Sequence, residues 1–85
     1  MNSKHLKTYY HIYRDPVQSD IEWTDIEALF KALGAEITEG NGSQVRVKLN
    51  NERAVFHRSH PEKVTDKGAV KSVRRFLNNA GVKLS

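Results

Sequence analysis

Histidines are the residues of this 85-residue chain best suited to proton transfer near neutral pH, because an unperturbed imidazole has a pKa of about 6.5. His57 and His60 lie among basic residues, whereas His5 and His11 fall where we expect exposed helix positions. A metal site at His57 and His60 would need a third ligand, and none stands at a recognisable spacing. Cysteine is absent, which excludes a thiol nucleophile and thiolate metal ligands. We therefore expect no metal or other cofactor.

Basic residues form a larger group with a recognisable chemistry, and they are unevenly distributed. The net charge is +4, but residues 1–44 carry four Lys or Arg against seven Asp or Glu (−3), and residues 45–85 carry ten against three (+7). This polarity favours a surface that attracts phosphates, although an ordinary solvated surface is the alternative. The side chains that we expect to contact RNA are Ser43, Arg46, Lys48, Arg53, Arg58, Lys67, Lys71 and Arg74.

Two helices are predicted before residue 35. A tyrosine-rich stretch with apolar residues at spacings of three and four predicts a short helix over residues 3–13. Residues 24–27 (Thr-Asp-Ile-Glu) fit a capping box, in which the Thr and Glu satisfy each other's exposed amide hydrogens. A second helix should therefore begin there, with Trp23 packed beside the cap, and end at Gly34.

The middle of the chain has the period of a sheet. Residues 35–39 predict a short strand, and residues 44–49 alternate between apolar and polar side chains. Asn50-Asn51 suits a two-residue hairpin turn, because asparagine accepts the left-handed conformation that such turns require. Paired residue numbers then sum to 101, so Gln44 should lie directly opposite His57 on the exposed face, with side-chain roots about 5 Å apart.

A final helix is predicted to begin at a cap on Thr65 or Asp66, to run to about residue 79 and to end at Gly81. The element order predicts an α+β fold with an α-β-β-β-α core, a three-stranded antiparallel sheet and an extra N-terminal helix. Two helices should cover one face of the sheet and leave the other open to solvent. We expect a single domain over residues 1–85. No apolar stretch could span a bilayer and no signal peptide is recognisable, so we expect a cytoplasmic protein with no membrane contact.

Several of these features occur together in the HicA toxins. The turn at residues 40–43 (Gly-Asn-Gly-Ser) leads into an alternating basic strand, the next strand ends near an arginine, and a His60-Pro61 pair precedes a basic final helix. As an ordered set they resemble the HicA family over residues 22–84. The element order is also that of double-stranded-RNA-binding domains. Residues 1–20, a helix and its connection, are an extension not expected in the shortest relatives.

The resemblance implies a ribosome-independent mRNA endoribonuclease, working without a metal and neutralised by a HicB-type antitoxin. In that family a catalytic histidine opens the strand after the Gly-Ser turn, and here Gln44 occupies its position. An amide cannot take the proton of a ribose 2′-hydroxyl near neutral pH. His57 is the first candidate to replace that histidine. His60 ranks below it, because the proline that follows suggests a role in shaping the loop.

Three hypotheses remain open at this point. The first is a HicA-like toxin whose nuclease activity is weakened, lost or transferred to His57, with Arg46 or Lys48 stabilising the charge on the phosphate. The second is a non-catalytic RNA-binding module, and the third is a protein-interaction domain whose basic face meets an acidic partner. Growth arrest on expression would separate the first from the others, and salt-dependent RNA binding the second from the third. The oligomeric state is left open.

Overall fold

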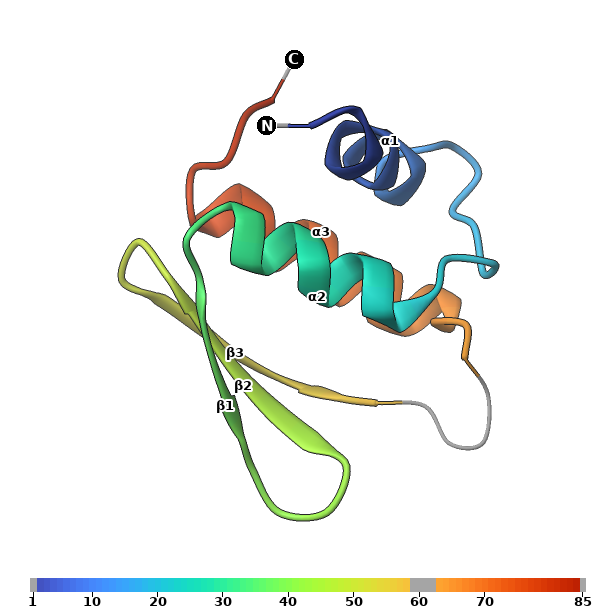
Figure 1. Cartoon of the computed structure of the whole chain (residues 1–85). Coiled ribbons are helices and arrows are strands. Elements are labelled where there is room, and N and C mark those ends of the chain that lie inside the picture. Colours follow the sequence, from blue (N-terminus) through green and yellow to red (C-terminus); the bar gives the residue numbers. More distant parts are fainter. Residues whose placement is uncertain (1, 59–62, 85) are drawn as a thin grey trace.

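The computed structural model describes residues 2–58 and 63–84, which form three helices and one three-stranded antiparallel sheet. In chain order the elements are α1 (Ser3–Ile12), α2 (Trp23–Ala32), β1 (Glu36–Glu39), β2 (Gln44–Leu49), β3 (Glu52–His57) and α3 (Lys67–Asn79) (Figure 1). From α2 onward this order is α-β-β-β-α. The predicted α+β fold is therefore confirmed.

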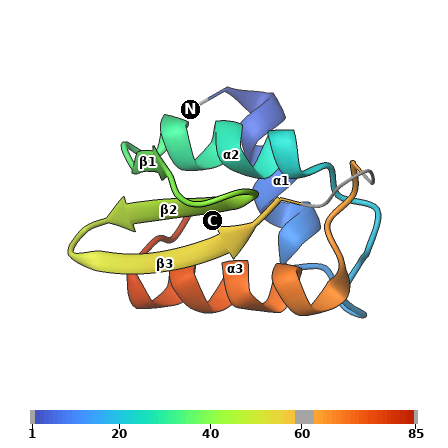
Figure 2. The ribbon, with the colours of Figure 1, turned by 90° about the horizontal axis from the view of Figure 1, so that it is seen from below.

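The elements form three layers. α2 and α3 cover one face of the sheet, with α2 packed against β1 and α3 against β3 (Figure 2). α1 lies on the far side of α2 and α3, so both of these helices are packed on two sides (Figure 1). Ile12 of α1 is fully buried and Tyr9 is nearly so. The N-terminal helix therefore contributes to the hydrophobic core.

The β2–β3 hairpin has the predicted register. Asn50 and Asn51 have positive φ angles of 50° and 70°, as a two-residue hairpin turn requires. The valines and the leucine of β2 are buried beneath the helices, and the polar residues between them point to the other side. Directly opposite one another on that open side lie Gln44 and His57, Arg46 and Val55, and Lys48 and Arg53.

Aromatic side chains fill the space between the helices and the sheet. Trp23, Phe30, Phe56 and Phe76 form one buried cluster, with neighbouring ring centroids 5.5 to 6.3 Å apart. Burial of these large apolar surfaces is the main favourable contribution to folding. Phe56 of β3 is 5% exposed and points toward the helices, so it offers no ring on the open face for a base to stack on.

The predicted capping box at residues 24–27 is wrong. α2 begins at Trp23, and the residue at its N-cap position makes no side-chain cap hydrogen bond. Two backbone hydrogen bonds, 3.0 and 2.7 Å long, instead join residues 21–23 to residues 63–65 and hold the chain as it enters the helix. The helix therefore begins ahead of the predicted cap. Glu27, the last residue of the box, instead accepts hydrogen bonds from Arg58.

The other helix boundaries lie close to the predicted ones. Asp66 caps α3 by accepting a hydrogen bond from the N–H of Ala69 at 2.8 Å, and Gly81 follows the helix with a φ of 77°. α1 is capped by Asn2, which accepts from the N–H of His5 at 3.0 Å. Over the part of the chain that the structure describes, no helix combines the length and the apolar character needed to cross a membrane.

Candidate nucleic-acid interface

The open face of the sheet carries cationic side chains from two strands. Arg46 and Lys48 on β2 and Arg53 on β3 are exposed there, since opposite residues of an antiparallel pair project to the same side. All three line a shallow depression of about 450 Å³. Like charges this close repel one another unless an anion lies between them, so the arrangement favours a bound phosphate.

β1 adds two side chains to this face that were not among the predicted site residues. Thr38 lies opposite Arg46, and Glu36 lies opposite Lys48. Both residues line the depression. The Glu36 carboxylate lowers the attraction for phosphate on the β1 side, so the most favourable position for an anion lies toward Arg46 and Arg53. Alternation along residues 35–39 could have placed both side chains on this face.

Gln44 and His57 form the pair at the far end of the hairpin from its turn. His57 is exposed and Gln44 is half-buried. The Gln44 side chain packs against the preceding turn, because a Cβ on Gly40 would lie 3.0 Å from Gln44 Cβ and 3.3 Å from its Oε1. Because Gly40 has no side chain, the Gln44 side chain can occupy this space. The titratable group across the strand from position 44 is the imidazole of His57.

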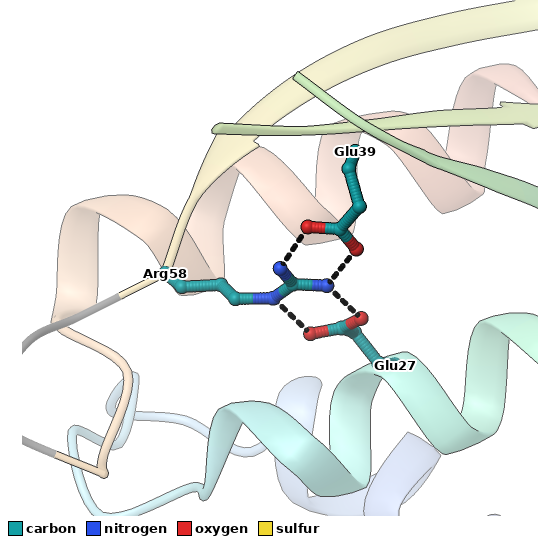
Figure 3. A network of polar contacts seen from close by, with 3 residues as sticks. All are labelled: Glu27, Glu39 and Arg58. Carbon is teal, nitrogen blue, oxygen red and sulfur yellow. Dashed lines mark hydrogen bonds and ion pairs between the residues drawn. The ribbon is translucent and has the colours of Figure 1, made fainter. Parts of the chain in front are cut away.

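Arg58, the residue after His57, was predicted to contact RNA, but its charge lies between two carboxylates (Figure 3). Nε and Nη2 donate to the Glu27 carboxylate at 2.9 Å each, and Nη1 and Nη2 donate to the Glu39 carboxylate at 2.5 and 2.8 Å. Hydrogen bonds to Glu27 and then to Glu39 raise the pKa of Arg58, and the bond from Arg58 holds the pKa of Glu39 below its usual 4.5. In this conformation the guanidinium is not presented to a phosphate.

The Arg58 network joins three parts of the fold beside the Gln44–His57 pair. Glu27 comes from α2, Glu39 ends β1, and Arg58 follows β3. The N–H of Arg58 also donates to the carbonyl of Ser43 at 3.0 Å. The network thus fixes the turn at residues 40–43 relative to α2. We assign Arg58 a positioning role. The sequence did not indicate this role, because Glu27 was interpreted as part of a capping box and not as a partner of Arg58.

Arg74 was predicted to contact RNA, but its guanidinium is bound within the protein. Its Nε and Nη2 donate to the carbonyls of Ile12 and Arg14 at 2.6 Å each, and its guanidinium carbon lies 5.8 Å from the centre of the Tyr13 ring. Its side chain is 20% exposed, because α1 and the segment after it cover this flank of α3. Arg74 therefore fastens the N-terminal layer to the core.

Lys67 and Lys71, which were also predicted to contact RNA, are exposed on α3, but α3 lies behind the sheet and not on its open face. Arg75 was not among the predicted RNA contacts, but it is exposed and lines a groove between α3 and β3 together with Arg53. Arg75 stands four residues after Lys71 on the same helical stripe, and this spacing could have identified it. Arg75 therefore brings the basic side of α3 to the border of the sheet.

Two further predictions concern His60 and the absence of a metal site. His60, the second catalytic candidate, lies outside the described residues, and its role stays a prediction. Across residues 2–58 and 63–84, no three His, Asp or Glu side chains gather in an arrangement that could hold a metal ion.

Comparison with protein families gives one decisive result. A family model described as the HicA toxin of bacterial toxin-antitoxin matches residues 23–82, which is 60 of the 85 residues. The chain belongs to the HicA toxin family. The match begins with α2 and ends just past α3, so in this HicA chain α1 precedes the family region. Comparison with curated proteins and comparison with solved structures gave no match.

Proposed function

We propose that this HicA chain is an RNA-binding toxin whose interface is the open face of its sheet. The observation that carries the proposal is the gathering of Arg46, Lys48 and Arg53 around one depression, with no helix of the described chain above it. Such side chains neutralise phosphates and release condensed counterions, so binding depends on salt and shows little sequence preference. Membership of a toxin family makes an mRNA target and an antitoxin of the HicB type the expected partners.

We further propose that any cleavage uses His57. Its imidazole would accept the proton of a ribose 2′-hydroxyl, and the 2′-oxygen would form a bond to the adjacent phosphorus. The bond from that phosphorus to the 5′-oxygen then breaks, and the leaving oxygen takes a proton from solvent. Arg46 lies on β2, two residues along from Gln44, which is the residue opposite His57. Its guanidinium would stabilise the charge on the phosphate. Gln44 can donate hydrogen bonds to the backbone through its amide but cannot act as the base.

A non-catalytic RNA-binding module is the second candidate, and Gln44 is the observation that favours it. At the position where the resemblance to the family leads us to expect a histidine, Gln44 has no titratable group and packs against Gly40. The same cationic face would then bind RNA without cutting it.

Salt-dependent binding tests the proposed interface. Affinity for RNA should fall steeply with added salt, and Arg46→Gln should reduce the slope of log affinity against log salt by about 1. Lys7→Gln is the matched control, since it removes the same charge from an exposed position on α1, in the layer farthest from the sheet. An affinity that ignores salt, or equal effects of the two substitutions, would exclude this interface.

Cleavage assays with two variants separate the two candidates. If His57 is the base, His57→Ala should slow RNA cleavage about 100-fold or more while leaving binding intact. Undiminished cutting by His57→Ala would remove His57 from the mechanism. If the wild-type chain binds RNA without cutting it and Gln44→His cuts, the non-catalytic candidate is correct.

A further inference from the structure

The outer edge of β3 has backbone groups that the sheet does not use. The register of β2 and β3 and the hydrogen bond from Arg58 N–H to Ser43 O set the bonded pairs at residues 43–58, 45–56, 47–54 and 49–52. The N–H and C=O groups of Arg53, Val55 and His57 therefore point away from β2. Within the described chain, no strand pairs with β3 on that side. An unpaired strand edge of this kind can pair with another extended chain.

A groove runs along this edge. It has a volume of about 180 Å³ and lies between β3 and α3, lined on the strand by residues 52–56 and on the helix by Ser72, Arg75, Phe76 and Asn79. α3 runs alongside β3 (Figure 2), so a chain added to the edge would lie against the helix. The short side chain of Ser72 leaves room there. At one end, Asn79 Nδ2 lies 3.5 Å from Glu52 Oε2.

The charges and the exposed apolar surface along this edge indicate which occupant fits. Arg53 stands on the open-face side of the edge and Arg75 on the helix side, and both are exposed. Val55, two residues after Arg53 on β3, is 53% exposed and adds apolar surface beside the edge. In an incoming strand, carboxylates at alternate positions all point to one face. On the open face they would lie beside Arg53, and on the helix side they would lie beside Arg75.

The opposite edge of the sheet is less suitable. β1 has four residues against six in β3, and its bonding to β2 leaves the main-chain groups of Ile37 and Glu39 on the outside. It carries Glu36 and Glu39, and the Glu39 side chain is held by Arg58. Short, charged edge strands resist pairing.

We propose that β3 and α3 form a docking site for an extended, acidic segment of a partner protein, which adds to the sheet as a fourth strand beside β3. The inference goes beyond the proposed RNA-binding function, because it uses main-chain groups and Arg75 instead of the Arg46–Lys48 face. Main-chain hydrogen bonds supply affinity in this mode of recognition, and the flanking side chains supply specificity. An antitoxin segment of this composition would contact β3 beside His57.

A backbone substitution tests the site directly. Val55→Pro removes the outward N–H, and it breaks no bond to β2 because Val55 does not donate to that strand. Val55→Thr keeps the N–H and is the matched control. The probe is a short synthetic peptide in which Glu and Val alternate, compared with a peptide of equal charge in which prolines replace the valines. The first peptide should bind and slow amide exchange at Arg53, Val55 and His57, and the second should not.

The variants give distinct outcomes. Val55→Pro should weaken peptide binding about tenfold or more, Val55→Thr less than threefold, and Arg75→Glu about tenfold without any change of the backbone. Arg75→Glu therefore tests the site even if Val55→Pro does not fold. Peptide affinity equal in wild type and Arg75→Glu would overturn the proposal. So would a self-dimer that Val55→Pro disrupts, because the occupant would then be a second copy of this chain.

Discussion

The Arg58 network predicts an unequal dependence of stability on its two carboxylates. Both accept two hydrogen bonds from one guanidinium, but the Glu27 side chain is 14% exposed and the Glu39 side chain is 67% exposed. Glu27→Gln removes the charge and turns an amide NH₂ toward a donor. Charge-assisted hydrogen bonds contribute about 1.5–3 kcal/mol and exposed ion pairs about 0–1 kcal/mol. Because the Glu27 side chain is mostly buried, the range for charge-assisted hydrogen bonds applies. We therefore expect Glu27→Gln to lower the free energy of unfolding by about 1.5–3 kcal/mol.

Denaturant unfolding with Glu39→Gln as the control measures this difference. Both substitutions remove one negative charge from the same guanidinium, so the change in net charge cancels in the comparison. Glu39→Gln should cost clearly less, because water competes for its carboxylate. The midpoints should shift without a change in the slope of free energy against denaturant. A loss below about 0.5 kcal/mol for Glu27→Gln, or equal losses for the two variants, would refute the assignment of Glu27 as the anchor of the network.

Two further predictions concern acid stability and the N-terminal layer. Because Arg58 lowers the pKa of Glu39 in the folded protein, this pair stabilises the fold above the usual carboxyl pKa of 4.5, and its contribution disappears as the pH falls through the lower folded value. Between about pH 6 and about pH 3 the wild type should thus lose more unfolding free energy than Glu39→Gln, and parallel pH profiles would contradict the shift. Arg74→Met should cost about 1–3 kcal/mol and speed amide exchange in α1, because two carbonyls lose a charged donor. The neighbouring Arg75→Met should cost less than about 0.5 kcal/mol, and similar losses at both sites would argue against the fastening role of Arg74.

The sheet could be predicted from the sequence because its rules are local. A period of two assigns each side chain of residues 44–49 to a face, and the asparagine pair fixes where the chain reverses. These two facts were enough to place Gln44 opposite His57, as the structure confirms. The helical period separates the two sides of α3 in the same way, since its buried residues Val70, Val73, Phe76 and Leu77 recur at spacings of three and four.

The functions of individual charged residues on the helices could not be predicted in the same way. Arg74 and Arg75 both fall on the polar side of α3, and what separates them is the position of α1, which packs against one flank and leaves the other free. Glu27 matched a capping pattern, but its partner lies 31 residues later in the chain. Contacts of this kind depend on the arrangement of layers in space, and no local pattern encodes that arrangement.

The asparagine turn also determines where the chain tolerates changes in length. An extra residue between Asn50 and Asn51 would lengthen a surface loop and could leave the strand pairing as it is. An extra residue inside β3 would rotate every later side chain to the other face, which would turn Phe56 toward solvent and His57 toward the helices. Insertions among natural variants of this hairpin should therefore accumulate at its tip, and a strand insertion would have to be compensated by a deletion a few positions away.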